Sequence, residues 1–236
     1  MIRPRVFRLF PFAAALLLAG LTACQPAASA REVARLPAPA VDAAPSTAHD
    51  EVAVFAGGCF WGIEAVFERV KGVRRVTAGY SGGAAGTAHY DEVSDGDTGH
   101  AESVQVEFDP ARVSYGTLLQ VFFSVALNPT ELNRQGPDSG TQYRSVIFYG
   151  NDEQKKIATD YIAQLSAAKA FAAPIVTQVV PLKAFYPAEA YHQHYYDLHP
   201  RNPYIVINDA PKVAHLQRLF PELYQAPQRA VEIQLH

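Results

Sequence analysis

The chain has 236 residues, of which 49% are hydrophobic and 18% are charged, and its formal net charge is −3. This composition is typical of a globular protein with one sizeable core, and it shows no basic patch of the kind that nucleic-acid-binding proteins carry. Only two cysteines are present, Cys24 and Cys59, so we do not expect a framework of disulfide bonds.

The first 23 residues are typical of a secretory signal peptide. Three arginines precede an apolar stretch over residues 9–21, which is too short to cross a membrane. The stretch ends in Leu21-Thr22-Ala23-Cys24, which resembles the lipoprotein box of bacterial envelope proteins. This resemblance implies cleavage before Cys24 and acylation of its thiol. The alternative is ordinary cleavage after Ala28-Ser29-Ala30, which would remove Cys24.

Residues 24–50 are rich in Ala, Pro and Ser and show no periodic apolar face, which is typical of a disordered tether. Gln25, rather than an aspartate, follows Cys24, and this resembles the sorting signal for the outer membrane. We therefore expect a folded domain over residues 51–225, held by lipid at the periplasmic face of the outer membrane, and a tail over residues 226–236. If cleavage instead removes Cys24, no lipid is attached, and we expect a soluble periplasmic protein.

The stretch around Cys59 predicts a strand that turns into a helix. The apolar run over residues 52–56 indicates a buried strand and leads into Gly57-Gly58-Cys59. Apolar residues then recur at helical spacing, at Ile63, Val66, Phe67 and Val70. Cys59 is therefore expected at a helix N-terminus, where the helix dipole stabilises a thiolate and lowers the thiol pKa. A buried structural cysteine is the alternative; the twin glycines and the adjacent Trp61 favour a nucleophile.

Later patterns predict strands that alternate with helices. Strands are expected over residues 73–80, 101–108, 143–149, 175–180 and 204–207, and helices over residues 114–126, from 152, from 187 and over 212–219. A long polar loop over residues 128–142 contains Asp138, and such loops are uncommon in compact domains unless they are functional. The order predicts an α+β fold, a two-layer α/β sandwich of the split βαβ (ferredoxin-like) kind with a mixed sheet and long loops.

Three motifs resemble ligand sites but lack the residues that such sites need. The glycine-rich loop over residues 81–86 has no Lys-Ser/Thr pair after it, so it is not a phosphate-binding loop. Asp95 and Asp97 lack the further oxygen ligands of a calcium loop. His192 and His194 are two residues apart and would point to different helix faces, so we expect structural histidines and no metal site. A nucleophilic pair of Cys59 with His192 stays open.

Glu102 stands out in the strand over residues 101–108. Val104, Val106 and Phe108 share one face of this strand, and Glu102 has the same parity. A carboxyl in a core-facing row is partly desolvated, which raises its pKa and lets it act as an acid near neutral pH. The alternative is an edge position where Glu102 simply reaches water.

At Gly58-Cys59-Phe60-Trp61-Gly62 the sequence resembles peptide methionine sulfoxide reductases of the A type. The resemblance continues in order, from about residue 55 to residue 195. The further matching stretches are Gly79-Tyr80-Ser81-Gly82-Gly83, Tyr90, residues 96–102 (GDTGHAE), residues 134–145 (RQGPDSGTQYRS) and residues 188–193 (AEAYHQ).

This resemblance implies reduction of the S epimer of methionine sulfoxide, free or within proteins, through a sulfenic acid on Cys59. The implied roles are Cys59 as the nucleophile, Glu102 as the acid, Tyr90 and Tyr143 as hydroxyl donors to the sulfoxide oxygen, Asp138 as a supporting carboxylate, and Phe60 and Trp61 as the walls around the substrate methyl group. These roles suit the chemistry, because the oxygen must gain protons as the S–O bond breaks. Together with the signal peptide, they suggest an enzyme that repairs oxidised envelope proteins.

Two departures from the family pattern matter. No cysteine follows Cys59, whereas many relatives carry C-terminal resolving cysteines, so the expected reductant is an outside thiol: a thioredoxin-like protein, a glutaredoxin or a small thiol. Leu127-Asn128-Pro129 stands where relatives often have His-Asp-Pro. We expect a monomer with no bound cofactor, which acts on oxidised proteins or on free methionine sulfoxide. The competing hypotheses are a non-catalytic envelope lipoprotein that binds hydrophobic or oxidised peptides, and a thiol protease.

Overall fold

The computed structural model describes residues 34–44, 46 and 50–226. They belong to one compact unit that comprises Val33–His236, while a second unit, Met1–Glu32, lies outside the described residues. The predicted signal peptide, the lipidation site Cys24, the first part of the predicted tether and all but residue 226 of the predicted tail therefore also lie outside them. None of the described helices has the length and apolar character that crossing a bilayer requires.

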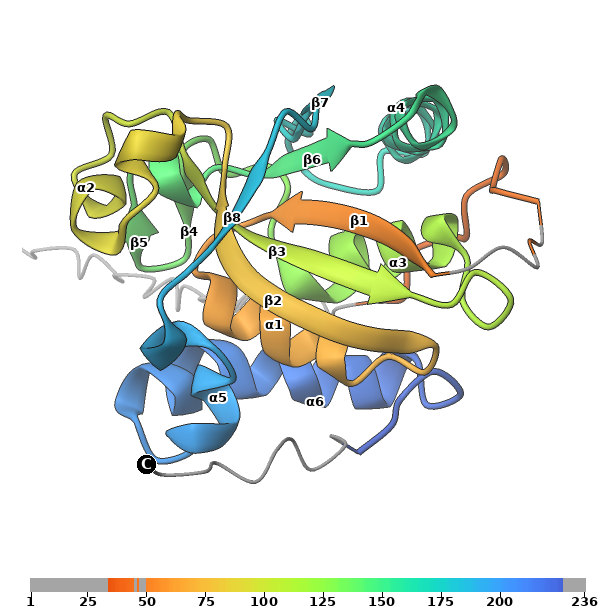
Figure 1. Cartoon of the computed structure of the whole chain (residues 1–236). Helices are drawn as coiled ribbons and strands as arrows, with labels where there is room; N and C mark the ends of the chain where they lie inside the picture. The colour runs from red at the N-terminus through yellow and green to blue at the C-terminus, as the bar shows by residue number, and fades with distance from the viewer. Residues whose placement is uncertain (1–33, 45, 47–49, 227–236) are drawn as a thin grey trace, which may run out of the picture. The chain divides into compact units, whose positions relative to one another are not determined.

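A six-stranded mixed sheet forms one layer of the domain (Figure 1). Its strand order is β7-β6-β1-β3-β2-β8, and every neighbouring pair is antiparallel except β6 with β7. The strands are β1 (Glu51–Ala56), β2 (Val73–Ser81), β3 (Ala101–Phe108), β6 (Val146–Tyr149), β7 (Gln178–Pro181) and β8 (Phe185–Pro187). A separate two-stranded hairpin comprises β4 (Arg134–Gln135) and β5 (Asp138–Ser139).

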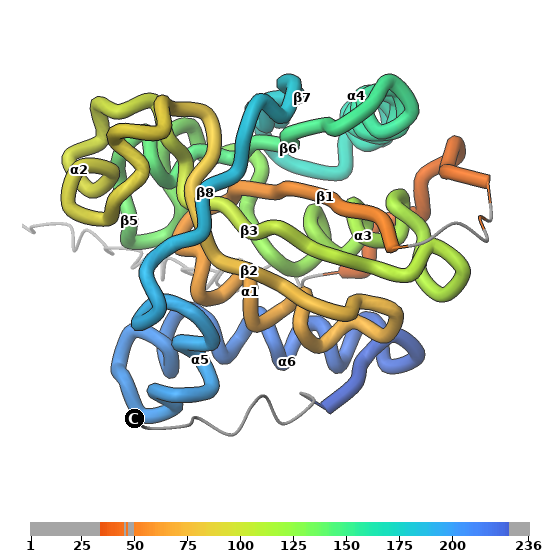
Figure 2. Tube along the Cα trace, in the orientation of Figure 1, coloured from red at the N-terminus to blue at the C-terminus, as the bar shows by residue number. Residues whose placement is uncertain are grey.

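Helices form the second layer. They are α1 (Phe60–Glu68), α2 (Tyr90–Ser94), α3 (Tyr115–Val121), α4 (Asp152–Ala167), α5 (Tyr195–Leu198) and α6 (Ala210–Leu219). The main core joins α1, α3, α4 and α6 to alternate residues of β1, β2 and β3, whereas a smaller cluster around Val54 and Phe148 covers the other face of the sheet. α1 packs on β2 and on α6 (Figures 1 and 2). The expected two-layer α+β sandwich with a mixed sheet is confirmed.

The C-terminal part of the domain departs from the predicted elements. Residues 204–207 do not form a strand, because Ile205–Asp209 is one wide helical turn that leads directly into α6. Its Val206 and Ile207 are exposed, so the β-branched run does not line a sheet. The helix expected from residue 187 is also broken, into the turn Ala190–His192 and the short α5. Local propensity is a weak guide here, because packing against α1 determines the conformation.

Residues 34–44, which the sequence assigns to a disordered tether, lie against the domain instead, and we call them the N-terminal strap. Backbone groups of the strap are bonded by side chains of the helical layer: Gln120 and Ser124 bond the backbone of Leu36, Tyr161 bonds that of Pro37, and Gln164 bonds those of Ala38 and Ala40. Asp42 accepts the N–H of Gly116 at 2.8 Å and the hydroxyl of Ser114 at 2.5 Å, so it supports Ser114, the N-cap residue of α3. Composition could not show this, because the partners lie 72 or more residues away in sequence.

Candidate active site

The strand-to-helix turn holds Cys59 as predicted. β1 ends at Ala56, Gly57 and Gly58 turn the chain, and Cys59 is the N-cap residue of α1. Gly58 has φ +95°, and a Cβ atom there would lie 2.6 Å from the Cβ of Gln135, so the turn requires glycine. Cys59 is a free thiol that is only 8% exposed.

The prediction of a lowered thiol pKa for Cys59 is wrong. Burial raises the pKa of the Cys59 thiol well above its usual value, and the nearby carboxyls of Glu102 and Asp209 raise it further. The backbone N–H of Trp61 and the charge of Lys212 act in the opposite direction but are outweighed. Desolvation disfavours a thiolate more strongly here than the helix N-terminus favours it, so the resting thiol is protonated.

Glu102 lies beside this thiol, on the interior strand β3, and is only 3% exposed. The edge alternative is therefore wrong. Burial raises the pKa of its carboxyl to about 8, with smaller contributions in the same direction from Asp138 and Asp209. Its Oε2 accepts the N–H of Phe60, the first residue of α1, at 3.0 Å, and this bond opposes the rise. Glu102 thus carries a proton at neutral pH, as the sequence analysis anticipates for an acid.

Two tyrosines and a carboxylate complete the group of residues around Cys59 and Glu102. Burial, followed by the charge of Glu102, raises the pKa of both Tyr90 and Tyr143, so both hydroxyls stay protonated. Asp138 contributes to the same shifts, and so does Cys59. The five residues predicted to be catalytic therefore come together in one site, although they come from the N-cap of α1, from α2, β3 and β5, and from the turn Thr141–Tyr143.

Tyr204 is a member of this site that sequence analysis missed. Its hydroxyl donates a hydrogen bond to Oδ2 of Asp138, and its ring meets the ring of Trp61 edge-on at 5.8 Å. Burial, with a contribution from Cys59, raises the pKa of the Tyr204 hydroxyl. Its sequence neighbourhood reads as a strand, so no local pattern indicates that this tyrosine faces Asp138.

His192 holds the aromatic wall in place. The indole Nε1–H of Trp61 donates to Nδ1 of His192 at 3.2 Å, and the ring of Trp61 stacks on Tyr195 with centroids 3.8 Å apart. Burial lowers the pKa of His192, so the imidazole is neutral and accepts this bond. Phe60 packs against the same imidazole at 5.0 Å. No hydrogen bond joins His192 to Cys59 within the described residues, so the protease-like pair is not formed there.

Glu189 was also missed by sequence analysis, although it lies in one of the matching stretches. One of its oxygens accepts the hydroxyl of Tyr80 and the other accepts the N–H of Tyr90, each at 2.9 Å. These bonds fix the start of α2 and with it the position of Tyr90. Glu189 therefore supports the site through Tyr90.

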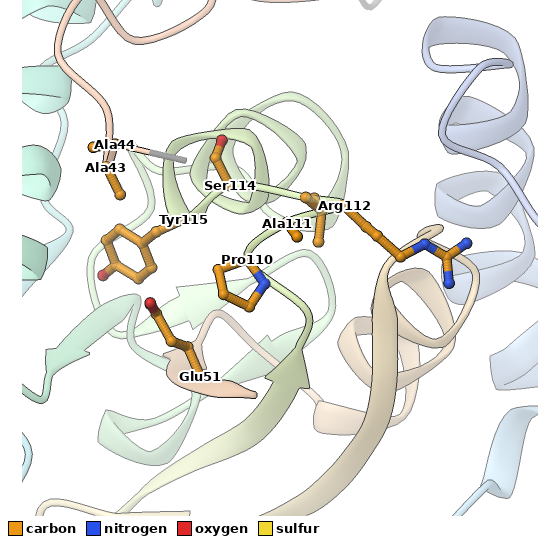
Figure 3. A pocket seen from close by; sticks show the side chains of 9 residues that line it. Ala43, Ala44, Glu51, Pro110, Ala111, Arg112, Ser114 and Tyr115 are labelled. Carbon is orange, nitrogen blue, oxygen red and sulfur yellow. The ribbon is translucent and has the colours of Figure 1, made fainter. Parts of the chain in front are cut away.

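A hollow of about 170 Å³ lies between the strap and the domain, and Ala43, Glu51 and Tyr115 are among the residues that line it (Figure 3). None of its lining residues belongs to the predicted site. Glu51 is the first residue of β1, whereas Cys59 comes after the turn that follows the other end of this strand, so the hollow lies at the opposite end of β1 from Cys59.

Comparisons with known proteins show which family the chain belongs to. The family model described as "Peptide methionine sulfoxide reductase" matches residues 51–223. Peptide methionine sulfoxide reductase MsrA 2 of Mesorhizobium japonicum is 62% identical over 174 residues, which cover 74% of this chain and 89% of the relative. Its namesake in Synechocystis is 50% identical over 81% of this chain and 91% of that protein.

Solved structures of similar fold point the same way. Reduced Mxr1 from Saccharomyces cerevisiae aligns with a TM-score of 0.58 and 34% identity, over 67% of this chain and 91% of that one. Methionine sulfoxide reductase A of Corynebacterium diphtheriae aligns with a TM-score of 0.56 and 32% identity, over 72% and 85% of the two chains.

Proposed function

Since the chain belongs to the peptide methionine sulfoxide reductase family and is a peptide-methionine (S)-S-oxide reductase, we propose that it acts through Cys59 as nucleophile and Glu102 as acid. The observation that carries this proposal is the buried Glu102 carboxyl, which accepts the N–H of Phe60, the residue that follows Cys59. Burial raises the pKa of this carboxyl to about 8.

In the proposed reaction, the sulfur of Cys59 attacks the sulfoxide sulfur while Glu102 gives its proton to the sulfoxide oxygen. The hydroxyls of Tyr90 and Tyr143 donate hydrogen bonds to the same oxygen, and Asp138 holds the neighbouring Tyr204. The S–O bond then breaks. The protonated oxygen passes to the Cys59 sulfur as a sulfenic acid, and the S–S bond formed by the attack breaks, so that methionine leaves. The proton released by the thiol restores Glu102. The sulfoxide gains the two electrons that Cys59 loses.

Phe60 and Trp61 form the proposed wall around the substrate methyl group. An apolar aromatic surface suits a methyl group and excludes water from Glu102, which keeps the carboxyl protonated. His192 and Tyr195 fix the orientation of the Trp61 ring. A rigid wall places the sulfoxide sulfur against Cys59 rather than merely binding the side chain.

An outside thiol closes the proposed cycle. Residues 60–236 contain no cysteine, so none of them can form a disulfide with the sulfenic acid of Cys59. One reductant thiol forms a mixed disulfide with Cys59 and releases water, and a second thiolate then frees Cys59. A thioredoxin-like protein, a glutaredoxin or a small thiol supplies these electrons.

Turnover tests this proposal with the two cysteines as a matched pair. The Cys59→Ser variant should lose reduction of S-sulfoxide with dithiothreitol as the reductant, whereas Cys24→Ser should keep it. Unchanged turnover in Cys59→Ser would refute the mechanism. If the wild-type protein bound sulfoxide peptides but released no methionine, the non-catalytic binding protein would be the better account.

We further propose that the enzyme is a lipoprotein that repairs oxidised proteins of the bacterial envelope. The support is the signal-like sequence over residues 1–23 and the position of Cys24 directly after it. The mass of the mature protein tests this: a lipid-modified N-terminal Cys24 is expected in the membrane fraction, while a chain that begins after Ala30 would refute the anchor.

A further inference from the structure

A second cluster of chemically reactive side chains lies on α1, beyond the site around Cys59. Glu64 and Glu68 are one helical turn apart on α1 and therefore share a face. His194, the residue that precedes α5, lies against the same face. One ligand atom from each of the three residues lies within 4.8 Å of the other two. Nδ1 of His194 and Oε1 of Glu68 are 2.5 Å apart.

Glu64 is the unusual member of this cluster, because it is fully buried with half of its carboxyl unpartnered. Its Oε2 accepts the N–H of His194 at 2.9 Å, while Oε1 has no hydrogen-bond partner within the described part of the chain. A buried carboxylate oxygen without a partner is strongly unfavourable. Burial and the neighbouring Glu68 accordingly raise the pKa of Glu64 to about 8.

Arg69, on the turn that ends α1, does not satisfy Glu64. The guanidinium of Arg69 donates to the carbonyl of Ala65 and pairs with Asp197, and it approaches only the far oxygen of Glu68, at 3.8 Å. His194 itself has φ +54°, a left-handed conformation that non-glycine residues seldom adopt. The surrounding contacts therefore hold its imidazole beside the two carboxylates in spite of the backbone strain.

We propose that Glu64, Glu68 and His194 form a binding site for one divalent metal ion of the zinc type. One imidazole nitrogen and two carboxylate oxygens are ligands that zinc accepts, with water in the fourth position. Ligand atoms around a zinc ion lie roughly 3.3 to 3.5 Å apart. The longest separation in the cluster, at most 4.8 Å, must therefore close by up to about 1.4 Å, and the 2.5 Å pair of His194 and Glu68 must open by about 0.9 Å. The side chains of His194 and Glu68 are 37% and 15% exposed, which gives the ion an entry path and gives the ligands room to move.

This site would fasten the wall of the catalytic pocket to α1. His194 lies two residues after His192, which accepts the hydrogen bond from Trp61. An ion shared by α1 and His194 would therefore fix the segment that orients Trp61. Its expected role is structural, and the reaction at Cys59 does not depend on it. Sequence analysis rejected His192 and His194 as a metal pair, and the ligands proposed here differ because α1 supplies two of the three.

Metal analysis tests the proposal in the full chain carrying Cys24→Ser and Cys59→Ser, since free thiols would themselves bind zinc. The protein is stripped with a chelator, equilibrated with zinc at about pH 8, dialysed, and measured by elemental mass spectrometry. About one zinc ion per chain is expected in the parent. The variants Glu64→Gln and His194→Asn should each bind zinc at least about tenfold more weakly. Asn tolerates the left-handed backbone and keeps the N–H that Glu64 accepts. Circular dichroism of the stripped proteins checks that both variants are folded.

Glu153→Gln on the surface of α4 and His215→Asn on α6 are the matched controls, and both should bind zinc like the parent. Zinc at about 100 times its dissociation constant should raise the melting temperature of the parent by at least about 5 °C and leave that of His194→Asn unchanged. A parent that retains no zinc would overturn the proposal. Equal retention of zinc by the parent, Glu64→Gln and His194→Asn would also overturn the proposal.

Discussion

The pH dependence of the chemical step is the sharpest consequence of the raised pKa of Glu102. The acid form is the reactive one in the proposed mechanism. With a pKa of about 8, about 90% of the carboxyl is protonated at pH 7 and about 10% at pH 9. An ordinary glutamate of pKa about 4.3 would be only about 0.2% protonated at pH 7. Burial therefore increases the amount of acid at neutral pH by a few hundredfold.

The expected rate profile follows directly. The rate constant for the first turnover of wild-type enzyme should be flat from about pH 6 to 7 and should fall by about tenfold between pH 7 and pH 9, because the proton on Glu102 is lost as the pH rises through its pKa. Glu102→Gln should lower the plateau by roughly 10²- to 10⁴-fold and abolish the fall above pH 8. Rapid-quench measurement of methionine released in one turnover, with excess enzyme and no reductant, isolates this step.

Glu107→Gln is the matched control, since Glu107 lies on the same strand but pairs with Arg75 at the surface. It should reproduce the wild-type rate and pH profile. A wild-type rate that climbs steadily from pH 6 to pH 9 would refute the reasoning, because ionisation of the Cys59 thiol would then control the step. A Glu102→Gln variant as fast as wild type would remove Glu102 from the acid role.

Three further predictions concern the parts that position the site. Gly58→Ala should destabilise the domain by about 1 to 3 kcal/mol in urea unfolding, because of its positive φ and the clash with Gln135, whereas Gly86→Ala, which meets no neighbour, should have little effect. Asp42→Ala should lower the unfolding free energy by about 1 kcal/mol with unchanged turnover, since it removes the strap's bonds to the first turn of α3 while Ser114 still caps the helix; equal stability would show that the strap does not hold there. Trp61→Phe keeps an aromatic wall but loses the bond to His192, so steady-state kinetics should show a higher KM and a lower kcat, and wild-type values would contradict the positioning role.

Local sequence patterns predicted the parts of the fold that depend on neighbours in sequence. The turn at Cys59 follows from a strand pattern, twin glycines and a helical pattern, all within 20 residues. The burial of Glu102 follows from its parity with Val104 and Val106. The strap and the turn at residues 205–209 could not be predicted in this way, because distant helices supply the contacts that determine them.

The electrostatics of the site were harder to predict than its membership. Helix position alone suggested a low thiol pKa at Cys59, but burial and two nearby carboxyls outweigh the helix N-terminus. The carboxyl of Asp209 comes from the other end of the domain sequence, packed against Gly62 in the first turn of α1. Tyr204 and His192 likewise act through contacts with Asp138 and Trp61 that no spacing in the sequence reveals.

The intact mass of the protein after one turnover tests the central claim most directly. Wild-type protein incubated with a peptide containing S-methionine sulfoxide, without reductant, should gain the mass of one oxygen atom on Cys59 and release one reduced peptide per chain. Cys59→Ser should show neither change, and a thiol reductant should return the wild-type protein to its starting mass. Reduced peptide without oxygen on Cys59, or oxygen on another residue, would contradict the account.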